Sequence, residues 1–451
     1  MRYAAAPMHH HHRRRRELHR VDEGLLGTRE LVAIAVGGMI GGGIFSVLGL
    51  AAQIAGHAAP LALGVGALVA GAAGYSYAKL ALAYPRDGAS YTYLQRAFPS
   101  NPVVGSVTGW TVILGYIGTL ALYSFTFGAY ASDLLGHPGS APWRIALGLG
   151  ALGAFLGVNL AGVREAGIVE DLIVYAKIAI LGFIGAIGLS QVQVAKMTPV
   201  FDRGIGAVFS AGALIFVAYE GFQLTTNAVQ ETEDPRRTLP RSIYAAIALV
   251  GVIYVSLAFV AVGTLSVDQL VAAEEYALAV VAQPILGNLG RVLVGVAAMF
   301  ATSSAINSTL FGASRLMADM ADTGSMPAGL GVRSARNVPV RAVVAMTVPA
   351  GVLMLAGTLN LIAAFSSMTF LLVSVAVSVA NVRLRADTKA TMWLIWLGLV
   401  LMGATIILLV AHLVDTDVPT LLGIMAGYVV AVALEEIYRR HRERHPPGTS
   451  A

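Results

Sequence analysis

Long apolar segments separated by short polar and charged stretches dominate this chain of 451 residues. Because about 20 apolar residues cross the hydrocarbon core of a bilayer as a helix, the pattern predicts twelve transmembrane helices. The third and eighth segments are long enough to tilt or to extend beyond the bilayer. The segments are 28–53, 60–83, 103–135, 142–161, 168–189, 205–229, 240–264, 286–320, 342–357, 361–382, 390–412 and 419–437.

The first segment contains a glycine-rich stretch, Val36-Gly-Gly-Met-Ile-Gly-Gly-Gly-Ile-Phe45. Each glycine in a helix interior costs roughly 1 kcal/mol relative to alanine, so the five glycines disfavour a continuous helix by about 5 kcal/mol. One interpretation is a helix broken inside the membrane, whose main-chain groups form a binding site. The other is close helix packing, since Gly37-x-x-x-Gly41 also fits a face of small residues.

The sixth segment carries its own interruption, Phe216-Val-Ala-Tyr-Glu-Gly-Phe222, near its middle. The first and sixth segments occupy corresponding places in two successive groups of five. Paired interrupted helices predict an inverted repeat with a binding site at mid-membrane. This correspondence favours a broken helix at Gly37–Gly43 over a packing face alone.

Composition supports a membrane protein and removes several classes of chemistry. The chain is 57% hydrophobic and only 12% charged, whereas soluble domains carry about 25% charged residues. The absence of cysteine excludes disulfides and thiolate chemistry, and the sequence shows no P-loop, zinc-protease or serine-hydrolase motif. We therefore expect no enzyme activity, no cofactor and no metal. The basic residues are spread over loops, which does not favour a nucleic-acid partner.

The distribution of basic residues predicts the orientation of the chain. With the N-terminus inside, 25 of the 30 Lys and Arg residues lie on the inner side, four lie outside and one lies within a span. This asymmetry predicts that both termini are cytoplasmic, and we expect the plasma membrane. A basic tail at 1–22, whose four consecutive histidines are native or part of an added tag, precedes a first repeat at 23–189. A second repeat at 190–385, two further helices at 386–437 and a basic tail at 438–451 follow.

The chain contains six sequence motifs, at 38–45, 84–91, 158–163, 219–227, 231–240 and 304–315. They resemble those of the amino acid–polyamine–organocation (APC) superfamily, above all its prokaryotic proton-coupled amino acid transporters. Together they cover about residues 27–385 in the family's order. The resemblance implies an all-α membrane protein of twelve helices with a LeuT-type 5+5 inverted repeat, discontinuous helices 1 and 6 and two extra helices.

The resemblance assigns the carboxylate of an amino acid substrate to the broken first helix, at Ile40, Gly41, Gly42 and Gly43. The physical reason is general: free N–H groups and the positive end of a helix dipole attract an anion, and glycine permits close approach. Many relatives carry serine at the position of Gly42. Its absence here leaves carboxylate binding to the backbone alone.

The broken sixth helix is expected, by the same resemblance, to bind the substrate's ammonium group. Carbonyls of Phe216, Ala218 and Tyr219 would accept its hydrogen bonds beside Gly221. Phe216, Tyr219 and Phe222 either close over the ligand as an aromatic gate or pack between helices.

Glu220 is a carboxylate at mid-membrane, where a charge is costly and usually faces a cavity or a partner. Three roles are open to it: binding a cationic group of the substrate, exchanging a proton, or bonding the broken helix as a protonated structural acid. Thr119 and Tyr123 of the third helix are candidates for the wall of the side-chain pocket.

Lys177 lies at the middle of the fifth segment, roughly 15 Å from either end at 1.5 Å per residue. Burial penalises the charged form of an amine, so this lysine can gain and lose a proton during a transport cycle. The resemblance gives such a lysine the place of a sodium ion in proton-coupled transporters; the alternative is a fixed structural cation. Glu170, on the same helix face nearer the cytoplasm, either relays the proton or is a solvated acid at the helix end.

In the eighth segment Thr302, Ser303 and Ser304 offer hydroxyl groups of the kind that complete a sodium site in sodium-coupled relatives. Ordinary interhelical hydrogen bonds are the alternative, and Lys177 argues against sodium.

These observations predict a secondary active transporter that takes up an amino acid, with protons and the lipid bilayer as its other partners. Alternatives within the class are an amine, polyamine or amino acid exchanger and a sodium-coupled symporter. A passive channel and a membrane sensor are alternatives outside it.

Overall fold

The computed structural model describes residues 26–85, 89–162 and 167–444. Over these residues the chain is helical, and its extended pairing is a single isolated bridge between Leu26 and Thr232. The tail predicted at 1–22 and the last residues of the tail at 438–451 lie outside the described residues.

The longer helices are α2 (Thr28–Met39), α3 (Gly43–Ala55), α4 (Ala59–Ala83), α5 (Ala89–Ala97), α6 (Pro102–Leu134), α7 (Ala141–Ala161), α8 (Gly167–Leu189), α9 (Ile205–Leu214), α11 (Pro235–Thr264), α13 (Ala277–Asp322), α14 (Val340–Ala356), α15 (Leu359–Arg383), α17 (Met392–Thr416) and α18 (Val418–Arg444). Short α-helices and 3-10 turns connect them: η1 (Gly56–Ala58), η2 (Val194–Met197), η3 (Ile215–Tyr219), α10 (Leu224–Asn227), η4 (Val229–Glu231), α12 (Val267–Ala273), η5 (Glu274–Tyr276), η6 (Ala328–Leu330) and α16 (Arg385–Thr388).

Each of the twelve apolar segments coincides with one helix or with an interrupted pair. Within the described residues, ten helices are long and apolar enough to cross a membrane. Two predicted spans fall short for physical reasons. The first is divided between α2 and α3 by its glycines, and the ninth, α14, is an apolar helix of only 17 residues.

Proline and glycine mark several helix ends in the way local chemistry requires. Pro60 and Pro235 lie in the first turns of α4 and α11, where a missing N–H costs nothing because these donors lack intrahelical partners. Gly162 follows α7 in the left-handed conformation, with φ of 74°, a common helix ending. At Gly287, φ of 64° bends α13, so its first turns lie outside the main span.

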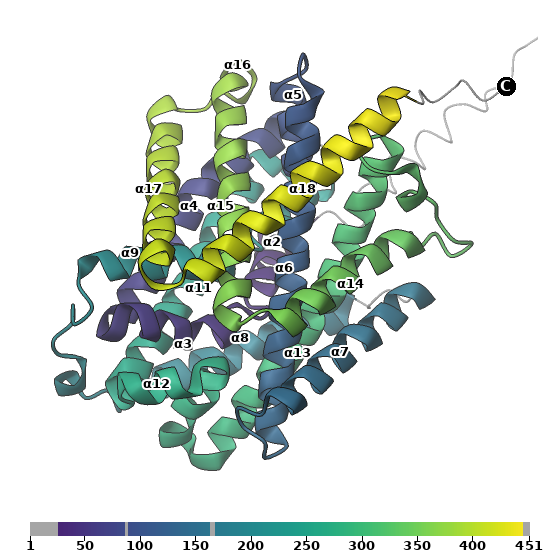
Figure 1. The fold of residues 1–451 in the computed structure, drawn as a ribbon. Coiled ribbons are helices and arrows are strands. Elements are labelled where there is room, and N and C mark those ends of the chain that lie inside the picture. Colours follow the sequence, from purple (N-terminus) through teal and green to yellow (C-terminus); the bar gives the residue numbers. More distant parts are fainter. Residues whose placement is uncertain (1–25, 86–88, 163–166, 445–451) are drawn as a thin grey trace, which may run out of the picture.

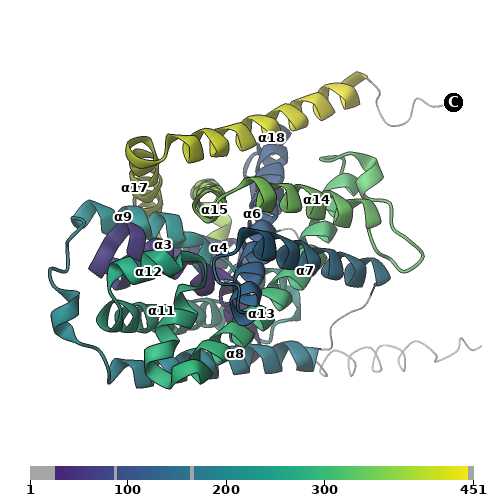
Figure 2. The same cartoon turned by 60° about the horizontal axis from the view of Figure 1, so that its bottom comes forward.

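Helix α6 lies at the centre of the bundle and packs against α13, α7, α15 and α14 (Figure 1). Helix α11 packs against α4, α2 and α8 on the other side of the core. Helix α17, in yellow-green, lies at one side of the bundle in Figure 1 and α18, in yellow, crosses its front, whereas both lie along the upper edge in Figure 2. There α17 contacts α15, α9 and α4, and α18 contacts α6 and α15.

The outer surface of the bundle is apolar. Large side chains such as Leu68, Val252 and Ile407 are 66–70% exposed. A continuous exposed apolar surface of this kind is unfavourable in water, and it suits helices surrounded by lipid. The structure is therefore that of a multi-pass helical membrane protein.

Candidate functional site

The first predicted break is present where the glycines lie. Helix α2 ends at Met39 and α3 begins at Gly43. Between them Ile40 leaves the helical conformation, with φ of −85° and ψ of 51°. The prediction of an interrupted first helix is confirmed.

The second predicted break is also present. Helix α9 tightens into the 3-10 turn η3, which ends at Tyr219, and Glu220 is extended with ψ of 132°. Gly221 follows with φ of 135°, a conformation that residues with a Cβ rarely adopt. The short helix α10 then begins at Leu224.

The two breaks lie against each other, main chain to main chain. A methyl group at Gly221 would lie 2.5 Å from the carbonyl carbon of Gly38, and one at Gly43 would lie 2.7 Å from the Cα of Ala218. The Tyr254 hydroxyl donates to the Met39 carbonyl at 2.8 Å and approaches the Ala218 carbonyl at 3.3 Å. The glycine run is therefore both an interruption and a close-packing surface, so the two sequence interpretations describe one feature.

Lys177 of α8 reaches the first break and is only 2% exposed. Its Nζ donates to the carbonyl of Ile40 at 2.8 Å and to that of Gly37 at 3.4 Å. These carbonyls belong to the C-terminal end of α2, where helix carbonyls lack intrahelical partners and the helix dipole is negative. The amine therefore binds the main chain at the break itself. The side chain of Glu170 lies outside the described residues.

A cavity of 440 Å³ lies beside the two breaks, between α6, α13 and α15. Of the predicted substrate residues, Glu220, Gly221 and Thr119 line it, together with Tyr123. Its size is within the range of about 300–1,000 Å³ typical of small-molecule sites.

The other predicted substrate residues are buried behind the cavity wall rather than on it. In the first helix they are Ile40, Gly41, Gly42 and Gly43, and in the sixth they are Phe216, Ala218, Tyr219 and Phe222.

The Tyr123 ring lies against Gly42. A methyl group at this glycine would lie 2.5 Å from Cδ1 of Tyr123, a cavity residue. The Tyr123 side chain thus fills the space that a side chain at position 42 would need.

The aromatic residues of the sixth helix pack between helices in this conformation. Phe216 and Tyr219 have no exposed surface. The Tyr219 hydroxyl donates to the Leu63 carbonyl at 2.8 Å, and the Phe222 ring meets Tyr77 edge-on at 5.6 Å between centroids.

Glu220 is 6% exposed and belongs to a small polar network at the second break. The Gln223 amide group donates to its carboxylate and accepts a hydrogen bond from the N–H of Gly221 at 3.0 Å. All three residues line the cavity. The carboxylate is therefore positioned both to bond the broken helix and to meet a ligand.

The three hydroxyl residues of α13 differ in their surroundings. Thr302 is fully buried and donates to the Ala298 carbonyl of its own helix at 2.7 Å. Ser304 is buried and Ser303 half-buried, and neither is among the described residues that line the cavity. The described part of the chain contains no cluster of three or more His, Cys, Asp or Glu residues suited to a metal ion.

Sequence reasoning did not assign several cavity residues to the site. On α6, Tyr116 joins Thr119 and Tyr123, and on α13 Ser308 and Arg315 face the same space. Positions three, four and seven residues apart share one face of a helix. This spacing from Thr119 could have identified Tyr116, but the face of α13 could not be assigned without its neighbours.

A cavity formed by two interrupted helices inside a multi-pass membrane protein is the arrangement of a transporter's binding site. Comparison with known proteins identifies the family. The family described as amino acid permease matches residues 26–434, so this chain belongs to it, and with it to the APC superfamily. The sequence-based assignment is confirmed.

Individual relatives agree with this membership. An uncharacterized protein of Methanocaldococcus jannaschii is 33% identical over 302 residues, which cover 66% of this chain and 68% of that protein. The inner membrane transport protein YbaT of Escherichia coli is 29% identical over 421 residues, 92% of this chain and 97% of YbaT. The branched-chain amino acid permease BcaP of Bacillus subtilis is 27% identical over 321 residues, 68% of each chain.

Proposed function

We propose that this permease is a proton-coupled symporter that takes up an amino acid or a related amine across the plasma membrane by alternating access. In this proposal the twelve helices form a LeuT-type inverted repeat with two extra helices, and the protein has no enzyme activity. The position of Lys177 carries the proposal. Its ammonium group donates to the carbonyls that the first break leaves without helical partners.

The contacts of Lys177 link the protonation of its amine to the shape of the transport site. A charged amine stabilises the negative end of α2, and loss of its proton removes that attraction. Because α2 ends at the break that packs against Gly221, a change in its end alters the wall of the cavity. By the family resemblance, such a lysine takes the place of a sodium ion, and its ammonium group disfavours a second cation nearby, which favours protons over sodium.

The cavity supports a substrate with an ammonium group. The Glu220 carboxylate lies on its wall among the aromatic residues Tyr77, Tyr116 and Tyr123. Such a site attracts a cation by charge and by the faces of the rings. An amino acid presents this group, and so does the second candidate substrate, an amine without a carboxylate. The absence of a serine at Gly42 favours that second candidate.

The shape of the site supports an inward-facing state. The central cavity extends along α13 to Arg315 and Asp319, and a neighbouring hollow of 770 Å³ shares Asp319 with it. The bias of basic residues predicts this end of α13 to be cytoplasmic. Toward the opposite end, the Tyr130 hydroxyl donates to the Phe45 carbonyl at 2.9 Å and holds α3 against α6.

Uptake into proteoliposomes tests the proposal. A panel of labelled amino acids and amines is offered with and without an imposed pH gradient, and with and without sodium. We expect saturable accumulation of one or more compounds that depends on the pH gradient. Uptake that follows sodium and ignores the pH gradient contradicts proton coupling, and uptake without saturation indicates a channel. Trans-stimulation without net accumulation indicates an exchanger.

The substitution Glu220→Gln separates the roles of this carboxylate. If it binds the substrate's cation, the variant loses affinity for amines while the pH profile stays. If it exchanges the proton, accumulation loses its pH dependence. Unchanged substrate range and pH profile leave only a structural role.

A further inference from the structure

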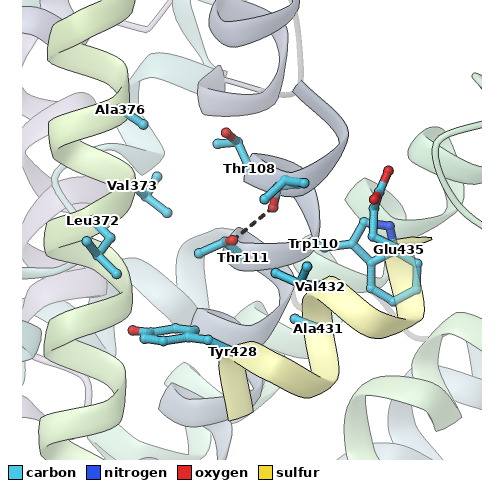
Figure 3. Close-up of a pocket in the computed structure, with 11 residues that line it drawn as sticks. Thr108, Trp110, Thr111, Leu372, Val373, Ala376, Tyr428, Ala431, Val432 and Glu435 are labelled. Atoms are coloured by element: carbon cyan, nitrogen blue, oxygen red, sulfur yellow. Dashed lines mark hydrogen bonds between the residues drawn. The ribbon is translucent and has the colours of Figure 1, made fainter. Parts of the chain in front are cut away.

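A second pocket, distinct from the central cavity, lies between α6, α15 and α18 (Figure 3). Its volume is 250 Å³, and apolar residues from all three helices form most of its wall, among them Val107, Leu372 and Val432. Val373 lines both this pocket and the central cavity. The pocket therefore lies on the outer side of the wall that separates the substrate site from the outermost helix.

Most polar groups in this wall already have partners. The hydroxyls of Thr108 and Thr111 donate to carbonyls of their own helix at 2.8 Å. The Trp110 indole N–H donates to the Ser325 carbonyl at 3.1 Å, and the Tyr428 hydroxyl shares a hydrogen bond with Thr369 at 3.0 Å.

Glu435 of α18 differs from these neighbours. It lines the pocket and is 3% exposed, and among the described residues it has no hydrogen bond or ion pair. The next residue, Glu436, is paired with Arg439 and Arg440 instead. A buried carboxylate is costly without a partner. A bound cation would offset this cost, and the neighbouring protein groups do not supply one.

The pocket also contains an aromatic face for such a cation. Figure 3 shows the carboxylate of Glu435 beside the ring of Trp110. A carboxylate next to an indole ring is favourable for an ammonium group, which the charge and the ring both attract. The apolar remainder of the pocket suits a hydrocarbon chain.

We propose that this pocket binds an amphiphilic amine, with its ammonium group at Glu435 and Trp110 and its hydrocarbon chain between α6, α15 and α18. The volume of 250 Å³ is below the usual range of about 300–1,000 Å³ for small-molecule sites. The occupant is therefore a single chain rather than a large ring system. This site is distinct from the substrate site, because Glu435 and Trp110 do not line the central cavity.

Quenching of Trp110 fluorescence tests the site. The chain has four tryptophans, and Trp143→Phe, Trp393→Phe and Trp396→Phe leave Trp110 alone. This variant, in phosphatidylcholine nanodiscs at pH 7, is titrated with brominated dodecylamine, brominated dodecanol or brominated dodecanoic acid. We expect saturable quenching by the amine at a concentration at least tenfold lower than that needed with the alcohol or the acid.

Glu435→Gln is expected to abolish the tenfold preference for the amine, and the matched control Glu436→Gln is expected to keep it. Ala431→Phe, which fills the pocket and leaves the carboxylate in place, is expected to remove saturable quenching by all three probes. It also provides the test if Glu435→Gln does not fold. Equal half-saturation by amine and alcohol, a preference that survives Glu435→Gln, or saturable amine quenching in Ala431→Phe would overturn the proposal. Substrate uptake is not the readout, so failure here leaves the transport proposal intact.

Discussion

Lys177 and Gly42 show how single residues define the first break. The amine of Lys177 ends α2 by binding its carbonyls, and Gly42 leaves room for the ring of Tyr123. Each residue contacts a residue that is far away in the sequence. Substituting one side chain therefore tests each contact.

Replacing Lys177 by methionine is expected to abolish accumulation driven by a pH gradient. Methionine keeps the approximate length of the side chain but has no amine that can bind or release a proton. Substrate exchange at equal pH on both sides is expected to continue, and its rate should no longer vary with pH. Uptake in proteoliposomes measures both quantities. Lys196→Met is the control, since Lys196 also donates to a carbonyl, that of Thr264 at 2.8 Å, but is exposed. Unaltered gradient-driven accumulation in Lys177→Met would rule out its role in coupling.

Gly42→Ser is expected to destabilise the protein by roughly 1–3 kcal/mol, the usual cost of overpacking, because the new Cβ would lie 2.5 Å from the Tyr123 ring. Thermal unfolding in detergent measures the effect. Gly64→Ala is the matched control: a methyl group there meets nothing within 4 Å, and alanine favours the helix.

The same prediction has a second test in a double variant. If a serine at position 42 and the Tyr123 ring compete for one space, the double variant Gly42→Ser, Tyr123→Leu should lose less stability than the two single variants together. Additive losses would show that the serine is accommodated elsewhere.

At the level of elements, partly buried ion pairs connect helices that surround the site. Asp133 at the end of α6 pairs with Arg291 of α13, and Arg144 of α7 pairs with Glu275 of η5. The side chain of Asp133 has no exposed surface. These pairs hold together the end of the bundle away from Arg315 and Asp319, where the central cavity extends.

Arg291→Met is expected to lower the stability of the protein by roughly 2–4 kcal/mol, because it leaves the Asp133 carboxylate buried without its partner. Adding Asp133→Asn should recover part of that loss, since the uncompensated charge is then gone. Unfolding temperatures of the single and double variants provide the measurement. Arg237→Met is the control, because its pair with Asp234 is exposed, with side chains 77% and 55% accessible, and such pairs contribute little. Equal effects at the two sites would contradict the argument from burial.

At the scale of the whole molecule, the orientation in the membrane rests on the distribution of basic residues. The native chain has no cysteine, so a single introduced cysteine can be labelled without a background signal. Ser190 and Ser334 are both exposed in loops, after α8 and before α14. They are predicted to lie on opposite sides of the membrane.

A membrane-impermeant maleimide added to intact cells is expected to label Ser190→Cys and not Ser334→Cys. After the cells are permeabilised, both variants should react, which controls for the reactivity of each site. Labelling of Ser334→Cys alone in intact cells would reverse the orientation, and with it the inward-facing assignment of the cavity.

Sequence and structure agree best on features that depend on local composition. The apolar segments, the interruptions at Gly37–Gly43 and Phe216–Phe222 and the depth of Lys177 could all be predicted from the chain. Hydrophobic length and the cost of glycine in a helix act within one segment. The family resemblance was also confirmed, because it rests on short motifs that can be read directly from the sequence.

The site itself depended on helices far apart in the sequence. Of the residues predicted to bind substrate, Glu220, Gly221 and Thr119 line the cavity, while Gly42 lies behind Tyr123 and Phe216 packs in the core. The spacing of residues gives the face of each helix but not its partner.

The sequence by itself therefore determined that this chain is a membrane permease with two broken helices and a buried lysine. Only the tertiary structure decided which main-chain groups that lysine binds and which side chains face the cavity. Composition acts along the chain, whereas folding brings distant residues together: Gly38 packs against Gly221, and Trp110 and Glu435 line one pocket.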